Sequence, residues 1–255
     1  MILLSFDIEE FDMPLEYQGK IDFQEQLSVS REGLIKILNI LQKYNAKATF
    51  FSTVVFAENN QDLIKRLLAE GHELGSHTWY HSQFEIEDLK KSREKLSELF
   101  GVEIKGLRMP RLKDVPNEDV LKAGYVYNSS LNPTFLPGRY NKLHISRTYF
   151  KEGNLHQLPA SVSPWRIPLF WLSFHNFPVA IYRHLAKRAL QKDGYLNLYF
   201  HPWEFMDITK ASYQLPGFTC KNTGSAMEKR FDEFLAFLAK QKHTFATFSQ
   251  FLKLK

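Results

Sequence analysis

Short apolar runs alternate with amphipathic helical patterns along most of this chain, and this alternation constrains the fold more than any other feature. The helical patterns place apolar residues at i, i+3, i+4 and i+7, as in Leu34, Ile37, Leu38 and Leu41. The apolar runs are short and rich in β-branched and aromatic residues, which is typical of buried strands. Strands that alternate with helices favour a parallel sheet covered by helices.

The expected elements follow from these patterns. Strands are expected at 2–7, 48–55, 73–76, 104–108, 125–129, 195–200 and 243–247, with one or two more within 157–162. Helices are expected around 34–41, at 63–70, 88–100, 118–123, 179–191 and 227–241, and in a short final turn from 249. For 255 residues, a single domain (1–255) with a closed or nearly closed β/α barrel fits better than two separate domains.

Composition and charge exclude several classes of protein. Apolar residues make up 44% of the chain and charged residues 24%, which excludes wholesale disorder and a coiled coil. The basic residues behind the net charge of +5 are spread along the chain, so no nucleic-acid partner is expected. Cys220 is the single cysteine, so any metal must be held mainly by His, Asp or Glu.

The N-terminus and the longest charge-poor stretch bear on location. The first residues lack the basic segment and the long apolar run of a secretion signal. If the chain begins at its natural start, this predicts a cytoplasmic protein. The stretch 167–182 is interrupted by Pro168 and Pro178, and it is too short for a transmembrane helix.

Polar side chains stand at the ends of the expected strands. Asp7 and Arg108 end two strands, while His77 and His201 directly follow two others. In a β/α barrel, the carboxyl ends of the strands form one face, and that face carries the active site. These four side chains are therefore expected to converge at one mouth.

The pair His77 and His81 is the most informative motif. Its i, i+4 spacing puts both imidazoles on one face of a helical turn, where both can bind one metal ion. Such pairs also occur by chance in many helices, but this one follows a short strand, and acids end the first strand. A catalytic zinc site usually has three protein ligands and an open position. Asp7 and Glu9 point the same way in an extended chain, so one could bind the metal while the other handles a proton.

Four ordered segments resemble the motifs of the polysaccharide deacetylases, the NodB-homology family (carbohydrate esterase family 4). They are Ser-Phe-Asp-Ile-Glu-Glu at 5–10, Gly-Ser-His-Thr-Trp-Tyr-His at 75–81, Arg-Met-Pro at 108–110 and Tyr-Phe-His-Pro-Trp-Glu at 199–204. Their order and spacing match over 2–204, and 245–252 resembles the family's closing strand and helix. The resemblance implies a distorted (β/α)₇ barrel, in agreement with the alternation.

The resemblance also implies catalytic roles. Asp7 matches the family's general base, Arg108 the arginine that holds this base, and His201 the general acid. The chain has no clear copy of the family's acid-plus-Trp motif, so the residue that orients His201 is not identified. The third motif continues with Arg111 and Leu112 instead of the common small and aromatic residues, so the edge of the substrate site should differ.

A metal site is implied in the same way. Most members carry a metal-binding Asp directly after the base, where this chain has Ile8 followed by Glu9. This resembles a branch with an Asp-x-Glu first motif, which makes Glu9 the third ligand beside His77 and His81. The expected cofactor is one divalent ion, Zn²⁺.

The implied function is a metal-dependent hydrolase of linear amide C–N bonds. It would remove N-acetyl groups from an amino sugar in a bacterial cell-envelope polysaccharide or in its lipid-linked precursor, and the second substrate would bring it to the inner face of the membrane. Two alternatives stay open: a related hydrolase of a formyl-sugar or small ureide, and a catalytically silent sugar-binding barrel. The joint presence of the six site residues argues against the silent barrel.

The remaining polar and aromatic candidates have structural interpretations. Glu10 and Asp12 are expected in a solvated acidic loop. Trp79 and Trp203 belong either to a sugar-stacking wall or to the core. The other histidines are expected to be structural or exposed: His72, His144, His156, His175, His184 and His243.

The segment 165–182 is rich in large apolar side chains. It is expected either to fold back into the core or to form an exposed apolar lip beside the mouth, since contiguous exposed patches usually mark a partner or membrane surface. In the second case, Trp171 and Phe174 would help a lipid-linked substrate to bind.

Overall fold

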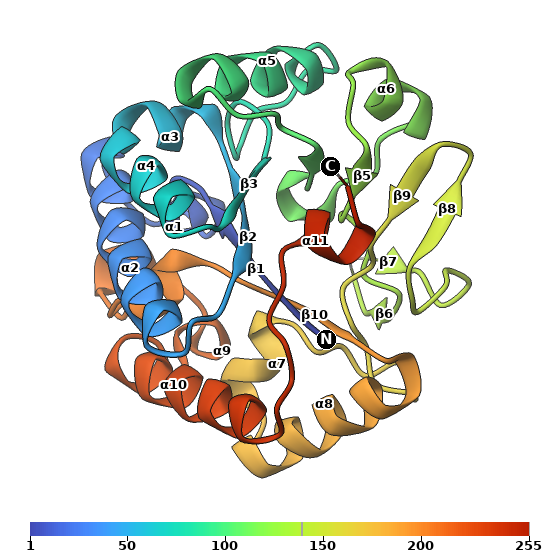
Figure 1. The fold of residues 1–255 in the computed structure, drawn as a ribbon. Helices are drawn as coiled ribbons and strands as arrows, with labels where there is room; N and C mark the ends of the chain where they lie inside the picture. Colours follow the sequence, from blue (N-terminus) through green and yellow to red (C-terminus); the bar gives the residue numbers. More distant parts are fainter. Residues whose placement is uncertain (139, 255) are drawn as a thin grey trace.

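A curved sheet with helices on its outer side forms the frame of the protein, shown by a computed structural model that describes residues 1–138 and 140–254 (Figure 1). Within these residues the sheet has eight strands in the order β10-β1-β2-β3-β4-β5-β9-β8. Neighbouring strands are parallel except for β8 and β9. The expected α/β architecture with a curled, barrel-like sheet is confirmed.

The elements have the following bounds. The strands of the sheet are β1 (Ile2–Ile8), β2 (Ala48–Ser52), β3 (Glu73–Ser76), β4 (Gly106–Leu107), β5 (Tyr127–Asn128), β8 (Phe150–Glu152), β9 (Leu155–Gln157) and β10 (Leu196–Phe200). A separate hairpin consists of β6 (Phe135–Leu136) and β7 (Tyr140–Asn141). The helices are α1 (Met13–Glu16), α2 (Phe23–Lys43), α3 (Val54–Asn59), α4 (Gln61–Ala69), α5 (Asp88–Phe100), α6 (Asn117–Lys122), α7 (Trp171–Asn176), α8 (Val179–Asp193), α9 (Gly217–Cys220), α10 (Ser225–Lys240) and α11 (Phe248–Leu252).

The chain that follows β9 lies beside β10 and links the two sides of the curved sheet. Ser161 N donates a hydrogen bond to Asn197 O, and Asn197 N donates to Ser161 Oγ, both at 2.8 Å. The Asn197 amide also donates to the carbonyls of Leu158 and Pro159. Side-chain hydrogen bonds of Ser161 and Asn197 thus replace part of a regular strand ladder between the two segments.

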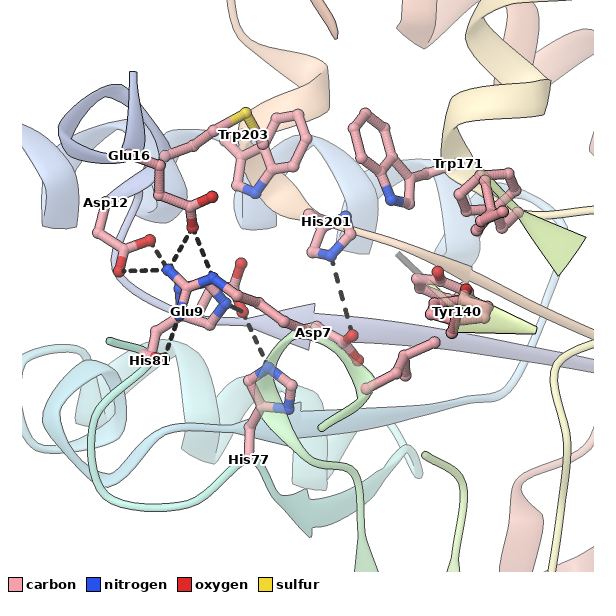
Figure 2. Close-up of a pocket in the computed structure, with 16 residues that line it drawn as sticks. Asp7, Glu9, Asp12, Glu16, His77, His81, Tyr140, Trp171, His201 and Trp203 are labelled. Atoms are coloured by element: carbon pink, nitrogen blue, oxygen red, sulfur yellow. Dashed lines mark hydrogen bonds and ion pairs between the residues drawn. The ribbon is translucent and has the colours of Figure 1, made fainter. Parts of the chain in front are cut away.

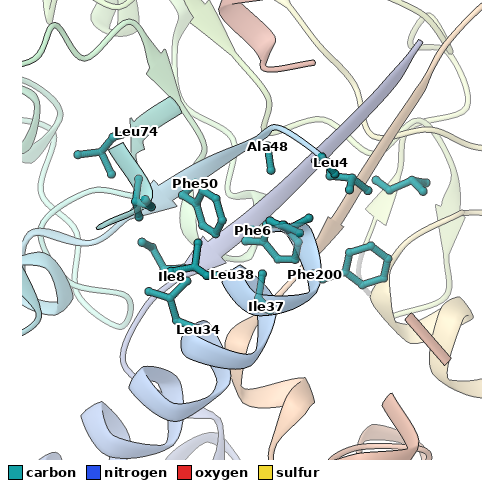
Figure 3. Packing of buried hydrophobic residues seen from close by; sticks show 14 of the residues in the cluster. Leu4, Phe6, Ile8, Leu34, Ile37, Leu38, Ala48, Phe50, Leu74 and Phe200 are labelled. Atoms are coloured by element: carbon teal, nitrogen blue, oxygen red, sulfur yellow. The ribbon is translucent and has the colours of Figure 1, made fainter. Parts of the chain in front are cut away.

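The outer face of the sheet packs against α2 (Figure 3). The residues that show the helical spacing in the sequence, Leu34, Ile37, Leu38 and Leu41, are all fully buried. On the sheet side, Phe6 stacks on Phe50 with ring centroids 5.0 Å apart. Burial of this apolar stripe fixes which face of β1 points outward.

Alternation along β1 directs its other side chains into the barrel. Leu4, Phe6 and Ile8 belong to the outer core, whereas Leu3 packs in an inner cluster with Phe51, Tyr127 and Phe248. Phe248 comes from α11, which fills the barrel near its amino-terminal end (Figure 1). Because side chains alternate with a period of two, Asp7 shares the inward direction of Leu3.

Several expected strands are shorter in the structure. The expected strand 48–55 stops at Ser52 because Thr53 Oγ1 accepts a hydrogen bond from Phe56 N (3.1 Å) and caps α3, which overrides the β propensity of the two valines. The strand expected at 243–247 is reduced to an isolated bridge between Ile2 and Phe245. The final helix begins after Thr247, whose side chain caps it, and not after Ser249.

The segment 165–182 folds largely into the core, and the interpretation of Phe174 as part of an exposed lip is wrong. Phe174 is 1% exposed, and its ring packs against those of Tyr182, Phe200 and Phe234 at 4.9, 5.2 and 5.5 Å. The turn of α7 directs this side chain inward. Among the helices that the structure describes, none has the length and apolar character needed to cross a membrane.

Gly33 gives a stability prediction, because α2 contacts the turn after β10 at this residue. A Cβ at Gly33 would lie 1.9 Å from Pro202 O, and Pro202 directly follows His201. We expect Gly33→Ala to lower the free energy of unfolding by about 1–3 kcal/mol, as overpacking does, although alanine normally stabilises a helix. Urea unfolding measures it, with Gly217→Ala as the control because nothing lies within 4 Å of that site. Stabilisation by Gly33→Ala would contradict the close contact.

Candidate active site

A pocket at the carboxyl ends of the strands brings together five of the six candidate site residues (Figure 2). Arg108 is the sixth, and it lies beneath the pocket with no exposed surface. The lining residues are Asp7, Glu9, Asp12, Met13, Glu16, His77, His81, Arg111, Leu112, Leu136, Tyr140, Phe170, Trp171, Tyr199, His201 and Trp203.

Glu9, His77 and His81 form a cluster with the donor set of a metal site. Glu9 Oε2 lies 2.9 Å from His77 Nε2 and 3.2 Å from His81 Nε2. This oxygen is buried, yet it makes no hydrogen bond of acceptable geometry with any residue that the structure describes. A buried carboxylate oxygen that faces two imidazole nitrogens without a hydrogen bond fits a divalent ion such as Zn²⁺.

The second nitrogen of each imidazole is anchored. His77 Nδ1 lies 2.8 Å from the carbonyl oxygen of Arg108, and His81 Nδ1 lies 2.6 Å from Asp12 Oδ1. Each Nδ1–H can donate to its oxygen, and each Nε2, once deprotonated, can offer a lone pair on the side that faces Glu9. Such outer hydrogen bonds fix the tautomer and the ring orientation that a metal ligand needs.

The two histidines do not lie on a helix, and the expected helical turn is wrong. Residues 77–81 form a loop in which Thr78 has a φ of 68°. The carbonyls of Thr78 and Trp79 accept hydrogen bonds from Val54 N and Val55 N, at 3.1 and 3.3 Å, so this loop is held by the first turn of α3. The spacing still brings the rings together, with centroids 5.8 Å apart.

The charges in this cluster shift the pKa of Glu9 and the pKa of His81 in opposite directions. Burial alone would raise the pKa of Glu9, but the charge of His81 and the proximity of His77 outweigh it and bring this pKa to about 2. Burial alone would lower the pKa of His81, but the charge of Glu9 and the hydrogen bond that His81 donates to Asp12 raise it to about 9. A metal that binds at neutral pH would therefore displace a proton from His81.

Asp7 and Arg108 form a buried ion pair. Arg108 Nη1 donates to Asp7 Oδ1 at 2.8 Å, while its Nε and Nη2 donate to the carbonyl and hydroxyl oxygens of Ser129. The guanidinium also lies over the ring of Phe51, 4.4 Å from the centroid. All of these contacts hold Asp7 in one orientation, with its other oxygen 3.8 Å from His201 Nε2.

Glu204 is the partner of His201 that the sequence motifs did not identify. Its Oε1 lies 2.9 Å from His201 Nδ1, and it also accepts a hydrogen bond from His201 N. Burial alone would lower the pKa of His201, but the hydrogen bond to Glu204 and the charges of Glu9, Glu204 and Asp7 raise this pKa above its ordinary value. The sequence did contain a signal for this partner, because an acid stands three residues after His201, at the start of a 3₁₀ turn.

The solvated acidic loop expected around Glu10 and Asp12 is wrong. Glu10 is 5% exposed and accepts a hydrogen bond from Thr53 Oγ1 at 2.6 Å, while Asp12 is 6% exposed and contacts His81. Burial raises the pKa of Glu10. The chain after β1 folds back over the barrel mouth, a path that the polar composition of the segment does not indicate.

The two candidate tryptophans differ in their surroundings. Trp203 is 1% exposed, lines the pocket and stacks on His201 with ring centroids 4.9 Å apart. Trp79 packs against the outer core and does not line the pocket. His72, expected to be structural or exposed, is buried and accepts a hydrogen bond from Ala48 N at the start of β2.

Asp12→Asn tests the anchoring of His81. We expect this variant to weaken metal affinity about 10–100-fold, as losses of such outer hydrogen-bond partners do. The asparagine keeps the size of the side chain but removes the charged acceptor of His81 Nδ1–H. A competition titration with a chelating dye measures the affinity, and Asp62→Asn is the control because Asp62 pairs with Arg31 at the exposed surface. Equal affinities in the wild type and Asp12→Asn would show that Asp12 does not support the site.

One segment of the chain matches a known family model. Residues 22–125 match the family model for polysaccharide deacetylase. This segment, which is less than half of the chain, is similar to polysaccharide deacetylases. The matched segment contains His77, His81 and Arg108, whereas Asp7, Glu9 and His201 lie outside it.

Two curated relatives illustrate how far the sequence similarity extends. An uncharacterized Bacillus subtilis protein, YlxY, is 33% identical over 118 residues, which are 42% of this chain and 37% of the relative. A peptidoglycan deacetylase of Helicobacter pylori is 29% identical over 119 residues, 43% of this chain and 41% of the relative. The chain thus matches less than half the length of each relative.

Solved structures share the fold over nearly the whole chain at low identity. A Pseudomonas aeruginosa protein named as a probable polysaccharide deacetylase aligns with 96% of this chain and 88% of its own (TM-score 0.65, 15% identity). A PuuE allantoinase aligns with 98% of this chain and 88% of its own (TM-score 0.64, 14% identity). A Bacillus anthracis pseudoenzyme of carbohydrate esterase family 4 covers 98% of this chain and 64% of its own (TM-score 0.54, 12% identity). These likenesses show the fold and leave the reaction open.

Proposed function

We propose that this polysaccharide deacetylase homologue, as one domain over 1–255, is a metal-dependent hydrolase that removes N-acetyl groups from an amino sugar. The observation that carries the proposal is the Glu9–His77–His81 cluster, which lies in one pocket with Asp7 and His201. The position of Glu9, two residues after Asp7, supports the Asp-x-Glu form of the first motif.

Glu9, His77 and His81 would hold the metal, proposed to be Zn²⁺. When bound, a divalent ion lowers the pKa of water and polarises an amide carbonyl, which are the two changes that amide hydrolysis needs. The three side chains offer one carboxylate oxygen and two imidazole nitrogens, a donor set typical of catalytic zinc.

Asp7 and His201 would move the protons. Asp7 takes a proton from the attacking water, and Arg108 keeps the carboxylate aimed at the pocket through the 2.8 Å contact. His201 Nε2 gives a proton to the nitrogen of the breaking C–N bond, so acetate and a free amine leave. The two side chains lie 3.8 Å apart and could return a proton from Asp7 to His201 after turnover.

The shape of the surface supports an extended carbohydrate substrate. A second hollow adjoins the pocket and shares Arg111, Leu112 and Tyr140 with it. A third hollow shares Lys113 and Asp114 with the second. Such a row of hollows gives room for neighbouring sugar units, whereas a small ureide would need the first pocket alone.

A bacterial envelope polysaccharide or its lipid-linked precursor is the substrate class we propose. Trp171 lines the pocket beside His201 and Trp203, with ring centroids 5.7 and 5.1 Å away, so it would contact the sugar in either case. Trp165 and Ile181 are more than half exposed and are better placed than Phe174 to meet a lipid chain. Use of a lipid-linked precursor would place the protein at the inner face of the membrane.

A substrate screen tests the proposal. The zinc-loaded protein is incubated with N-acetylglucosamine oligomers, an N-formyl sugar and a small ureide, and the acid or amine released is measured. We expect acetate from the oligomers. Release from the formyl sugar or ureide alone would favour the related C–N hydrolase, and zinc binding without turnover of N-acetylated glycans would favour the silent barrel.

A further inference from the structure

A second buried histidine stands behind the candidate general acid. His175, on α7, is fully buried, and its Nε2 lies 2.8 Å from Glu204 Oε2. Glu204 is also fully buried, and its other oxygen accepts the two hydrogen bonds from His201. The three side chains therefore form a chain from the pocket into the interior, His201–Glu204–His175.

The hydrogen-bond pattern indicates which ring nitrogen of His175 carries the proton. Its Nδ1 is buried and has no hydrogen-bond partner among the described residues. A charged imidazolium would leave a buried N–H without an acceptor, which is costly. The ring is therefore assigned as neutral with its proton on Nε2, where it donates to Glu204. The backbone of His175 is held by Asn222, whose amide donates to the His175 carbonyl at 2.6 Å.

The hydrogen bond that His175 donates matters because the charged carboxylate of Glu204 is fully buried. Burial alone would raise the pKa of this carboxyl, but the contact with His175 and then that with His201 lower it. Without His175, Oε2 would be an unpaired oxygen of a buried carboxylate, which favours protonation or rotation of the side chain. Either change would remove the negative partner of His201.

Among the described residues, four other charged or titratable groups approach the His201–Glu204–His175 series. Asp7 and Glu9 face His201 from the end of β1, and Tyr182 of α8 and Arg230 of α10 approach from the interior. Arg230 Nε donates to the carbonyl of Phe174 at 2.7 Å, so it is bound to backbone. Trp171 packs edge-on against both histidine rings, at 5.6 Å from His175 and 5.7 Å from His201.

We propose that His175 is a positioning residue: it donates to Glu204, and Glu204 in turn holds His201 protonated on Nδ1 with Nε2 facing Asp7 and the pocket. The inference rests on the proposed role of His201 as the general acid. It assigns a function to a histidine that stands outside the four motifs and on a different element from either of its partners.

The test compares His175→Phe with His175→Gln. Phenylalanine keeps an aromatic ring but has no donor, whereas the glutamine amide can donate from about the position of Nε2. We expect the pKa of His201, followed by histidine-ring NMR in the zinc-loaded protein, to fall by about one unit in His175→Phe, as loss of a neighbouring charge does, and to stay near wild type in His175→Gln. His184→Gln, on the exposed side of α8, is the control.

Turnover gives the second readout. In His175→Phe we expect kcat to fall about 10–100-fold, part of the 10²–10⁴-fold that a positioned acid contributes, with KM and zinc content little changed. If this variant does not fold, His175→Asn takes its place, because its shorter amide does not reach Glu204. An unchanged pKa of His201 in a folded donor-free variant would overturn the inference. The NMR titration needs no substrate. It therefore tests the role of His175 even if the wild type proves inactive on N-acetylated sugars.

Discussion

Replacing Asp7 by asparagine is expected to lower kcat for acetate release by about 10²–10⁴-fold, the contribution of a positioned base, while the protein keeps its full metal content. Asparagine has nearly the same size and can still accept the hydrogen bond from Arg108, but it cannot take a proton at neutral pH. The positive guanidinium beside Asp7 Oδ1 also makes this carboxylate a poor place for a cation. Single-turnover kinetics and metal analysis on the same samples measure both effects.

Glu9→Ala is the companion to this experiment. Glu9 Oε2 faces both imidazoles, so its removal should weaken metal binding and reduce activity through loss of the ion. Loss of metal from Asp7→Asn together with full metal content in Glu9→Ala would show that the two acids have exchanged roles. The Asp-x-Glu interpretation of the first motif would then be wrong.

His201→Ala is expected to lower kcat by about 10²–10⁴-fold with little change in metal content, because it removes the proton donor and no ligand. The rate of the wild type should also depend on pH in a defined direction. His201 must be protonated to act, and its pKa is raised, so the alkaline decline of the rate should lie above His's ordinary value of about 6.5.

The variant His184→Ala is the control for His201→Ala, because His184 is exposed on α8. Full activity of His201→Ala on N-acetylated oligomers would remove this residue from the mechanism. An alkaline limb centred below pH 6.5 would contradict the influence of Glu204 on His201.

The convergence of the site residues could be predicted from the sequence because strand geometry decides it. Asp7 and Leu3 are an even number of positions apart on β1, so their side chains share a face. The apolar face of α2 packs against the other side of the strand, which is therefore the outer one. Arg108 and His201 stand directly after strands that run parallel to β1, so they reach the same end of the sheet. Local pattern and topology were sufficient for these residues.

Contacts between residues far apart in the sequence account for the parts of the site that the sequence did not indicate. Asp12 supports His81 from 69 positions away, and His175 contacts Glu204 across 29 positions. A polar residue in a short loop has the same local signature whether it is solvated or buried. The loop 77–81 shows the related error, since a spacing of four suits a helix and also suits this loop, which the first turn of α3 holds in place.

Acetate release by the metal-stripped and zinc-reloaded protein shows directly whether the activity depends on an ion held by Glu9, His77 and His81. The substrate is an N-acetylglucosamine oligomer, and the wild type is compared with His77→Ala at equal protein concentration. We expect the wild type to lose activity on stripping and to regain it with about one equivalent of zinc, whereas His77→Ala neither retains the ion nor recovers activity. Full activity in the stripped wild type, or tight binding of one equivalent by His77→Ala, would contradict a hydrolase built on Glu9, His77 and His81.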